Sequence, residues 1–354
     1  MSEAETIFSA AGGLGHVVLN RPKVLNAISP DQFGQIDDQL AAWADDDAVR
    51  VVMIEGAGER AFCAGGDIRA VYDGWRQGDH AANRAIFRRE YRMDRRIAHY
   101  SKPYVALIDG ITMGGGAGVS VNGRYRVATE RTQFAMPETG IGFFPDVGAT
   151  HFLGRCPGRI NLYLGLTGAR IGPADALWAG LATHYVPSED LPGVKTALAS
   201  AANSTDPDGA VAEVLARAHS DPGPSVLAAR AEAIDRCFAA PTVRDIVSAL
   251  VADGGEWAWD AMEAIADKSP TSLGVTLVQL RDGHALSFDD AIRREYRLAC
   301  RFLAGRDLYE GIRALVVDKD RSPAWSPETL AEVDDGTVQG YFSPLLGEDE
   351  LPLP

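Results

Sequence analysis

The sequence predicts an α/β fold followed by a helical C-terminal region. Short apolar runs alternate with segments of helical periodicity, glycine-rich turns separate them, and the pattern beyond residue 225 is helical. With 354 residues, 46% of them hydrophobic, the chain can bury a large core. The expected organisation is an α/β core over residues 1–200, a linker or surface insertion over 201–225, and a helical region over 226–354.

The first elements are predicted in the order strand, helix, strand. Residues 14–20 form an apolar run typical of a strand, and Ser29 to Gln32 give a helix start with a capping box. Apolar residues then recur at helical spacing on one face: Phe33, Ile36, Leu40 and Trp43. Residues 51–54 predict a buried strand.

The later segments continue this pattern, with a strand at 104–108, a glycine-rich turn at 114–118 and a strand at 125–128. Residues 203–224 are rich in Ser, Asp, Pro and Gly around one short helical stretch, which indicates a linker or surface segment. Helical structure is expected over 302–317 and 327–333, and the tail at 347–354 is expected to fray.

Charge and composition exclude several classes of partner. The chain has 34 Lys and Arg against 49 Asp and Glu, a net charge of −15, which disfavours nucleic acid. An anionic ligand such as coenzyme A still fits, because local cations and helix N-termini act at short range. We find no secretory leader and no apolar run of ~18 residues, so we expect a cytoplasmic protein without a membrane partner. The four cysteines are widely spaced and are expected to be reduced and structural: Cys63, Cys156, Cys237 and Cys300.

Two glycine-rich segments are candidates for binding an oxyanion. AFCAGGDI at 61–68 has two glycines between a strand and a helix, and GITMGGGAG at 110–118 has three before an apolar helical run. One backbone N–H from each loop could converge on a carbonyl oxygen, each donor contributing roughly 3 kcal/mol to catalysis. Either loop alone is better explained as a tight turn, and only the two loops together with a third segment favour a binding site.

A third segment, FAMPETGIGFFPDVGAT at 134–150, places two carboxylates among apolar residues and glycines. Burial of Glu138 or Asp146 would raise the pKa of its carboxyl group, and this makes a Glu an effective base near neutral pH. An exposed loop with two solvated acids is the alternative, and the apolar neighbours argue against it.

These three segments, in this order and spacing, resemble the crotonase (enoyl-CoA hydratase/isomerase) superfamily. The similarity extends over about 14–342, including LNRPKVLNA at 19–27, which resembles the segment near the CoA adenine. The resemblance implies a spiral of ββα units followed by a helical C-terminal region. It also implies an oxyanion pair formed by the backbone N–H groups of Gly66 and Gly115.

The departures from that pattern narrow the expected activity. Hydratases of the superfamily use two glutamates, but Gly118 occupies the first position here, only Glu138 remains, and Asp146 stands where hydratases have glycine. This combination resembles the 3-hydroxyisobutyryl-CoA hydrolases, as do FRREYRMDRRI at 87–97 and EYRLA at 295–299. The resemblance implies hydrolysis of a short 3-hydroxyacyl-CoA thioester in valine degradation.

The resemblance also implies a role for each site residue. Glu138 would activate water or attack the thioester carbonyl, Asp146 would hold the substrate hydroxyl or orient the water, and Glu90 would be a third carboxylate near the substrate. Five further residues are expected to contact the substrate: Lys23, Leu25, Ala64, Asp67 and Ile68. No metal or separate cofactor is expected, because coenzyme A is part of the substrate.

Alternative functions follow from the same residues. An enoyl-CoA hydratase or isomerase could use Glu138 alone, and a non-catalytic acyl-CoA-binding protein could retain the pocket. Binding alone would not require both carboxylates and both glycine loops. RNA binding is disfavoured by the acidic charge balance. A homo-oligomer fits the resemblance, and the sequence leaves the oligomeric state open.

Overall fold

The computed structural model describes residues 4–345 and 350–353. The chain forms two compact units that interleave along the sequence. The first unit contains residues 4–66, 92–134 and 171–228, and the second contains 67–91, 135–170 and the described residues from 229 onward. The division at residues 200 and 225 expected from composition stays a prediction.

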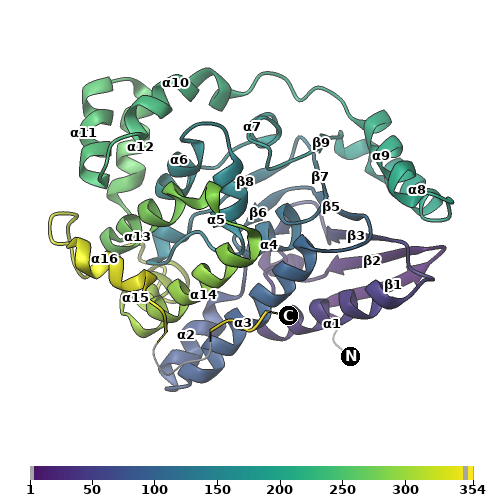
Figure 1. Ribbon diagram of the computed structural model, residues 1–354, viewed down its shortest axis with the longest axis horizontal. Helices are drawn as coiled ribbons and strands as arrows, with labels where there is room; N and C mark the ends of the chain where they lie inside the picture. The colour runs from purple at the N-terminus through teal and green to yellow at the C-terminus, as the bar shows by residue number, and fades with distance from the viewer. Residues whose placement is uncertain (1–3, 346–349, 354) are drawn as a thin grey trace. The chain divides into compact units, whose positions relative to one another are not determined.

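The first unit is built on two sheets (Figure 1). Neighbouring strands of the six-stranded sheet are β1 (Thr6–Ala11), β2 (Leu14–Leu19), β3 (Val51–Gly56), β5 (Tyr104–Ile108), β7 (Tyr125–Ala128) and β9 (His184–Tyr185). The strands of the small sheet are β4 (Ala61–Cys63), β6 (Ile111–Met113) and β8 (Gln133–Ala135). β1 is antiparallel to β2, whereas β2, β3, β5, β7 and β9 pair in parallel. Parallel pairing follows because each return of the chain crosses over before it re-enters the large sheet.

Successive strands alternate between the two sheets. The chain passes from β3 to β4 and then α2 (Ile68–Arg76), from β5 to β6 and then α4 (Gly115–Val121), and from β7 to β8 and then the 3-10 helix η2 (Glu138–Ile141). Each turn therefore adds one strand to each sheet before a helical segment. The α/β spiral of ββα units that the sequence predicts is confirmed.

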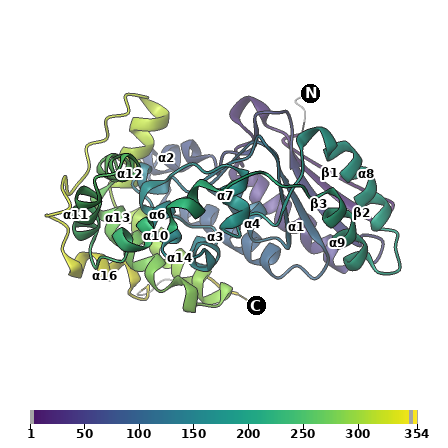
Figure 2. The same ribbon diagram turned by 90° about the horizontal axis from the view of Figure 1, so that it is seen from above.

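Both faces of the large sheet are covered within the first unit. Leu14, Val51 and Met53 pack with α8 (Leu191–Ala201) and α9 (Pro207–Ala218), which lie beside the strands in Figure 2. Side chains alternate along a strand, so Gly15 belongs to the opposite face, where it approaches the Trp43 ring of α1 (Pro30–Asp45). A Cβ atom at Gly15 would lie 2.9 Å from that ring, which explains the glycine.

The second unit is mainly helical. In addition to α2 it contains most of α3 (His80–Ala98) and of α10 (Val226–Phe238). It also contains the helices α5 (Ala149–Phe152), α6 (Ile160–Thr167), α11 (Val243–Asp253), α12 (Glu256–Ala266), α13 (Pro270–Arg281), α14 (Phe288–Ala304), α15 (Asp307–Ile312) and α16 (Asp335–Phe342). α13 contacts α6, α11 and α16, and most of its residues are buried. The expected helical C-terminal region is confirmed.

Most predicted elements are found, with small shifts at their ends. The strands at 104–108 and 125–128 have the predicted bounds, and Ser29 caps α1 with the predicted capping box, in which its backbone N–H donates to Gln32 at 2.8 Å. The stretch 203–224 contains α9. α4 begins at Gly115, so the helix starts inside the run of glycines that was expected to form a turn.

Two predictions near the C-terminus are wrong. Residues 327–333 form turns and not a helix, because the Glu332 carboxylate accepts the backbone N–H groups of Glu328 and Thr329, and α16 starts only at Asp335. The tail expected to fray is anchored in its described part: Arg297 donates to the Glu350 carboxylate at 2.8 and 2.9 Å. Residues 346–349 and 354 lie outside the described residues.

Candidate active site

The first glycine-rich loop joins β4 to α2. Gly65 has φ 113°, in the left-handed region that side chains disfavour. A Cβ atom at Gly65 would lie 3.3 Å from the carbonyl oxygen of Met113 and 3.7 Å from the amide nitrogen of Gly115. The loop that carries Gly66 therefore runs directly beside the start of α4.

The second loop is closed by α4. Gly114 caps this helix with φ 50°, and Gly115 is its first residue. The N–H of a first helical residue has no acceptor inside its own helix, so it can bind an external oxygen. The structure brings the two predicted loops together within the first unit.

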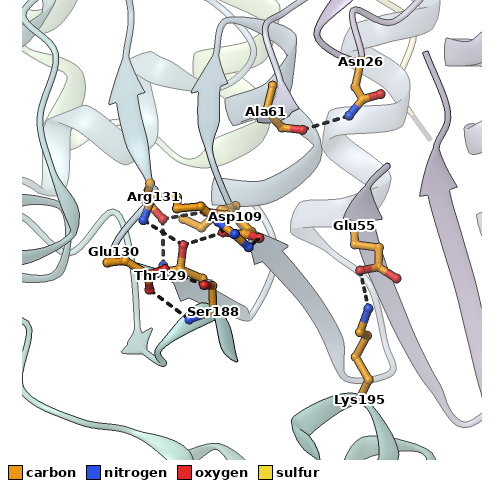
Figure 3. A network of polar contacts seen from close by, with 11 residues as sticks. Asn26, Glu55, Ala61, Asp109, Thr129, Glu130, Arg131, Ser188 and Lys195 are labelled. Atoms are coloured by element: carbon orange, nitrogen blue, oxygen red, sulfur yellow. Dashed lines mark hydrogen bonds and ion pairs between the residues drawn. The ribbon is translucent and has the colours of Figure 1, made fainter. Parts of the chain in front are cut away.

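The segment expected near the CoA adenine pairs with the first glycine loop. Leu25, which follows a 3-10 turn containing the exposed Lys23, accepts a 3.0 Å hydrogen bond from the Ala64 N–H. Asn26 donates from its side chain to Ala61 O at 2.8 Å, as Figure 3 shows. These contacts pair two segments. One carries the predicted substrate residues Lys23 and Leu25, and the other carries Ala64 and Gly66. Asp67 and Ile68 belong to the second unit, where they form the N-cap and first residue of α2.

The second unit contains a cluster of buried carboxyl groups, which consists of Glu90, Glu138, Asp146 and Glu295. Burial raises the pKa of Glu138 well above its usual range, and the nearby charge of Asp146 raises it further. Oε2 of Glu138 has no hydrogen-bond partner within the described part of the chain. A dehydrated carboxyl group with a raised pKa fits a base that works near neutral pH.

The other members of the carboxyl cluster share this electrostatic environment. Burial raises the pKa of Asp146 to about 7, although a hydrogen bond from Tyr91 opposes the shift. Burial also raises the pKa of Glu90 well above its usual range, and the charges of Asp146 and Glu138 add to that shift. Close carboxylates in a medium of low dielectric constant cannot all ionise together, so the cluster retains protons at neutral pH.

Tyr91 and Glu295 also belong to this site, although the sequence did not predict them as site residues. The Tyr91 hydroxyl donates a 2.7 Å hydrogen bond to Asp146 Oδ2. Glu295 is fully buried, and burial raises its pKa to about 8. A signal for Glu295 was present, because it shares the buried face of α14 with Ile292 and Leu298, where an acid is unexpected.

The described residues contain neither a metal-binding cluster nor a membrane-spanning helix. Among residues 4–345 and 350–353, no group of three or more His, Cys, Asp or Glu side chains is arranged to hold a metal ion. Within the same residues, every helix is too short or too polar to cross a bilayer.

A ββα spiral that carries a pair of glycine loops, together with a cluster of dehydrated carboxyl groups, defines an enzyme of the crotonase type. The family model for enoyl-CoA hydratase/isomerase matches residues 14–342. The chain belongs to the enoyl-CoA hydratase/isomerase family. This confirms the fold class and the family that the sequence motifs predict.

Relatives with full-length similarity carry different names. The mitochondrial 3-hydroxyisobutyryl-CoA hydrolase of Gallus gallus is 46% identical, over 99% of this chain and 92% of that protein. A solved carnitinyl-CoA dehydratase from Mycobacterium thermoresistibile is 42% identical with a TM-score of 0.92, over 99% of both chains. A solved enoyl-CoA hydratase from Rhodobacter sphaeroides is 38% identical with a TM-score of 0.91, over 99% of this chain and 100% of that one. The predicted resemblance to the 3-hydroxyisobutyryl-CoA hydrolases is confirmed by the first of these, and an acyl-CoA substrate agrees with all three names.

The expected cytoplasmic location is wrong, because the hydrolases similar to this chain are named as mitochondrial. The expectation rested on the lack of a secretory leader and of a long apolar run. Neither feature separates the cytoplasm from a mitochondrial compartment, since mitochondrial transit peptides are amphipathic and rich in Arg.

Proposed function

We propose that this protein hydrolyses the thioester of 3-hydroxyisobutyryl-CoA to 3-hydroxyisobutyrate and coenzyme A. The observation that carries the proposal is the 46% identity, over 99% of the chain, to a protein named for this activity. The carboxyl cluster supports it, because Glu138 and Asp146 lie buried in one unit and influence each other's charge. Hydrolysis of a thioester needs water, a base and stabilisation of an oxyanion, and no separate cofactor.

The glycine loops would stabilise the negative charge that develops on the thioester oxygen. We assign this role to the backbone N–H groups of Gly66 and Gly115. Backbone donors suit it because they are fixed before the reaction and need no reorganisation when the charge appears. Each such donor contributes roughly 3 kcal/mol in acyl-transfer enzymes.

Glu138 would carry the proton transfers. In one route its carboxylate removes a proton from water while the water oxygen attacks the carbonyl carbon. The C–S bond then breaks, and the proton passes to the departing thiolate. In the other route the Glu138 carboxylate attacks the carbonyl itself, CoA leaves, and water hydrolyses the resulting mixed anhydride. Both routes give free acid and CoA.

Asp146 and Glu90 would recognise the acyl group. Asp146 is assigned to the 3-hydroxyl of the substrate or to the attacking water, and Glu90 to a further contact with the substrate. Because the carboxyl cluster retains protons at neutral pH, one member can donate a hydrogen bond while another accepts one. Lys23, Leu25, Ala64, Asp67 and Ile68 would hold the rest of the CoA ester.

A hydratase is the second candidate, because the two solved structures of 42% and 38% identity are named as a dehydratase and a hydratase. The two reactions differ in one product, since hydration leaves the thioester intact and hydrolysis releases a thiol. A panel of short saturated, unsaturated and 3-hydroxylated acyl-CoA esters, followed by thiol detection, distinguishes them. Thiol release fastest with 3-hydroxyisobutyryl-CoA is expected. Hydrated acyl-CoA without thiol would overturn the proposal.

A further inference from the structure

The loop that carries Asp146 has an unusual backbone. Val147 has φ 56° and Gly148 has φ 91°, so two consecutive residues adopt the left-handed region. This conformation is strained for a β-branched residue. Such a conformation persists only where the surroundings fix it, and three side chains of the second unit contact this loop.

Glu295 of α14 holds the part of the loop that follows Asp146. Its Oε2 accepts the Gly148 N–H at 2.7 Å, and its Oε1 accepts the Thr150 N–H at 2.8 Å. The side chain is fully buried, so these hydrogen bonds are shielded from water. Both amides are bound by one rigid group, and this fixes the direction in which the chain leaves Val147.

Gln279 of α13 bridges the two ends of the same loop. Its Nε2 donates to Pro145 O at 2.7 Å and to Thr150 Oγ1 at 2.8 Å. Gln279 is also fully buried. Helices from the C-terminal region therefore hold the backbone on both sides of Asp146.

Tyr91 of α3 contacts the Asp146 carboxylate directly. Its hydroxyl donates to Oδ2 at 2.7 Å, and its ring makes edge contacts with Phe87 and Tyr296. A buried ring held on two sides has little rotational freedom, so the hydroxyl occupies a fixed point. The hydrogen bond to Oδ2 therefore fixes the orientation of the Asp146 carboxylate.

We propose that Tyr91 and Glu295 are positioning residues that aim the Asp146 carboxylate at the substrate hydroxyl and so give the enzyme its preference for 3-hydroxylated acyl groups. Tyr91 acts on the carboxylate and Glu295 acts through the backbone of residues 146–150. The inference rests on the proposed function, because it takes a 3-hydroxyacyl-CoA ester as the ligand of this site.

The test measures binding and does not depend on turnover. Non-hydrolysable thioether analogues of 3-hydroxyisobutyryl-CoA and isobutyryl-CoA are titrated calorimetrically, and the ratio of the two dissociation constants gives the hydroxyl preference. Tyr91→Phe, which removes one oxygen and keeps the ring, should weaken binding of the hydroxylated analogue about ten-fold and that of the other less than about two-fold. Glu295→Gln, which keeps a single acceptor for two N–H groups, should reduce the preference in the same direction.

The matched control is Tyr309→Phe. The Tyr309 hydroxyl donates to Leu303 O at 2.8 Å in the same unit, so its loss removes a similar buried hydrogen bond without changing the preference. In the double variant Tyr91→Phe with Asp146→Asn, the preference should equal that of Asp146→Asn alone, because both changes act on one group.

The result that overturns the inference is an equal loss of affinity for both analogues in Tyr91→Phe, or additive effects in the double variant. Should Glu295→Gln fail to fold, Tyr91→Phe and the double variant still decide the question. Wild-type protein that prefers the hydroxylated analogue but releases no thiol from the ester would refute the proposed hydrolysis and leave the positioning role intact. Wild-type protein without a hydroxyl preference would refute the positioning role.

Discussion

A Cβ atom on Gly116 would lie 2.3 Å from the carbonyl oxygen of Cys63. The obstacle is backbone of β4 and not the tip of a flexible side chain, so the two segments could separate only if α4 or β4 moved. Because Cys63 leads into the first glycine loop and Gly116 lies in the second glycine-rich segment, this contact sets the spacing of the loops that carry Gly66 and Gly115.

Gly116→Ala should therefore destabilise the protein and reduce its activity. Overpacking of this kind costs about 1–3 kcal/mol in the free energy of unfolding. Any separation of the loops also misplaces the proposed oxyanion donors, so hydrolysis should fall by more than ten-fold in protein that is still folded. Urea denaturation and thiol-release kinetics measure the two effects.

Gly34→Ala is the control for that variant. Gly34 lies inside α1, and a Cβ atom there would meet nothing within 4 Å. Alanine is favoured over glycine in a helix interior by about 0.5–1 kcal/mol, so Gly34→Ala should be slightly more stable than wild type with unchanged turnover. If Gly116→Ala and Gly34→Ala had similar effects on stability and turnover, the close approach of Gly116 to Cys63 would not be the cause of the loss in Gly116→Ala.

Local signals predicted most of the first unit. The strand at 104–108 is a short, fully apolar run, and Ser29 with Gln32 forms a cap that needs only neighbouring residues. The prediction at 327–333 failed because helical propensity competes there with a side-chain acceptor, Glu332, which binds two amides in turns.

The site was predictable to the extent that its chemistry shows in the local sequence. Glu138 and Asp146 stand among apolar residues, and this context alone indicates burial. Tyr91 and Glu295 reach Asp146 and its loop from 55 and 147 residues away in sequence, and no local pattern reports such pairing. Glu138 and Asp146 could therefore be predicted from the sequence, whereas Tyr91 and Glu295, which hold Asp146 and its loop, required the structure.

Glu138→Gln should remove most hydrolysis and leave binding of the ester nearly unchanged. An amide of the same shape cannot accept a proton or form an anhydride, so kcat should fall by about 10²–10⁴-fold, the range for loss of a general base. The dissociation constant of a non-hydrolysable ester analogue should change little. Glu189→Gln, at an exposed acid, serves as the control. Turnover within a few-fold of wild type in Glu138→Gln would exclude the assigned role.

Asp146→Asn and Asp146→Gly should reduce kcat/KM more for 3-hydroxyisobutyryl-CoA than for isobutyryl-CoA. Only the first ester has the hydroxyl that Asp146 is assigned to bind, and a hydrogen bond to a charged group contributes about 1.5–3 kcal/mol. The ratio of kcat/KM for the two esters is the quantity to compare. Equal losses with both esters would show that Asp146 acts on the water or on Glu138, and not on the hydroxyl.

The buried Glu295 should make the protein less stable as the pH rises. Folding raises the pKa of Glu295 from 4.5 to about 8, chiefly by burial. Between these values the folded state holds a proton that the unfolded state has lost. Its contribution to stability is complete below about pH 4.5 and disappears as the pH rises through about 8.

One such group contributes a slope of at most about 1.4 kcal/mol per pH unit to the free energy of unfolding. Glu295→Gln has no group to titrate at this position, so its free energy of unfolding should fall less steeply with pH than that of wild type. Urea denaturation at intervals of one pH unit measures both curves. Parallel curves for the two proteins would show that Glu295 has the same pKa in the folded and unfolded states. Burial would then not raise its pKa.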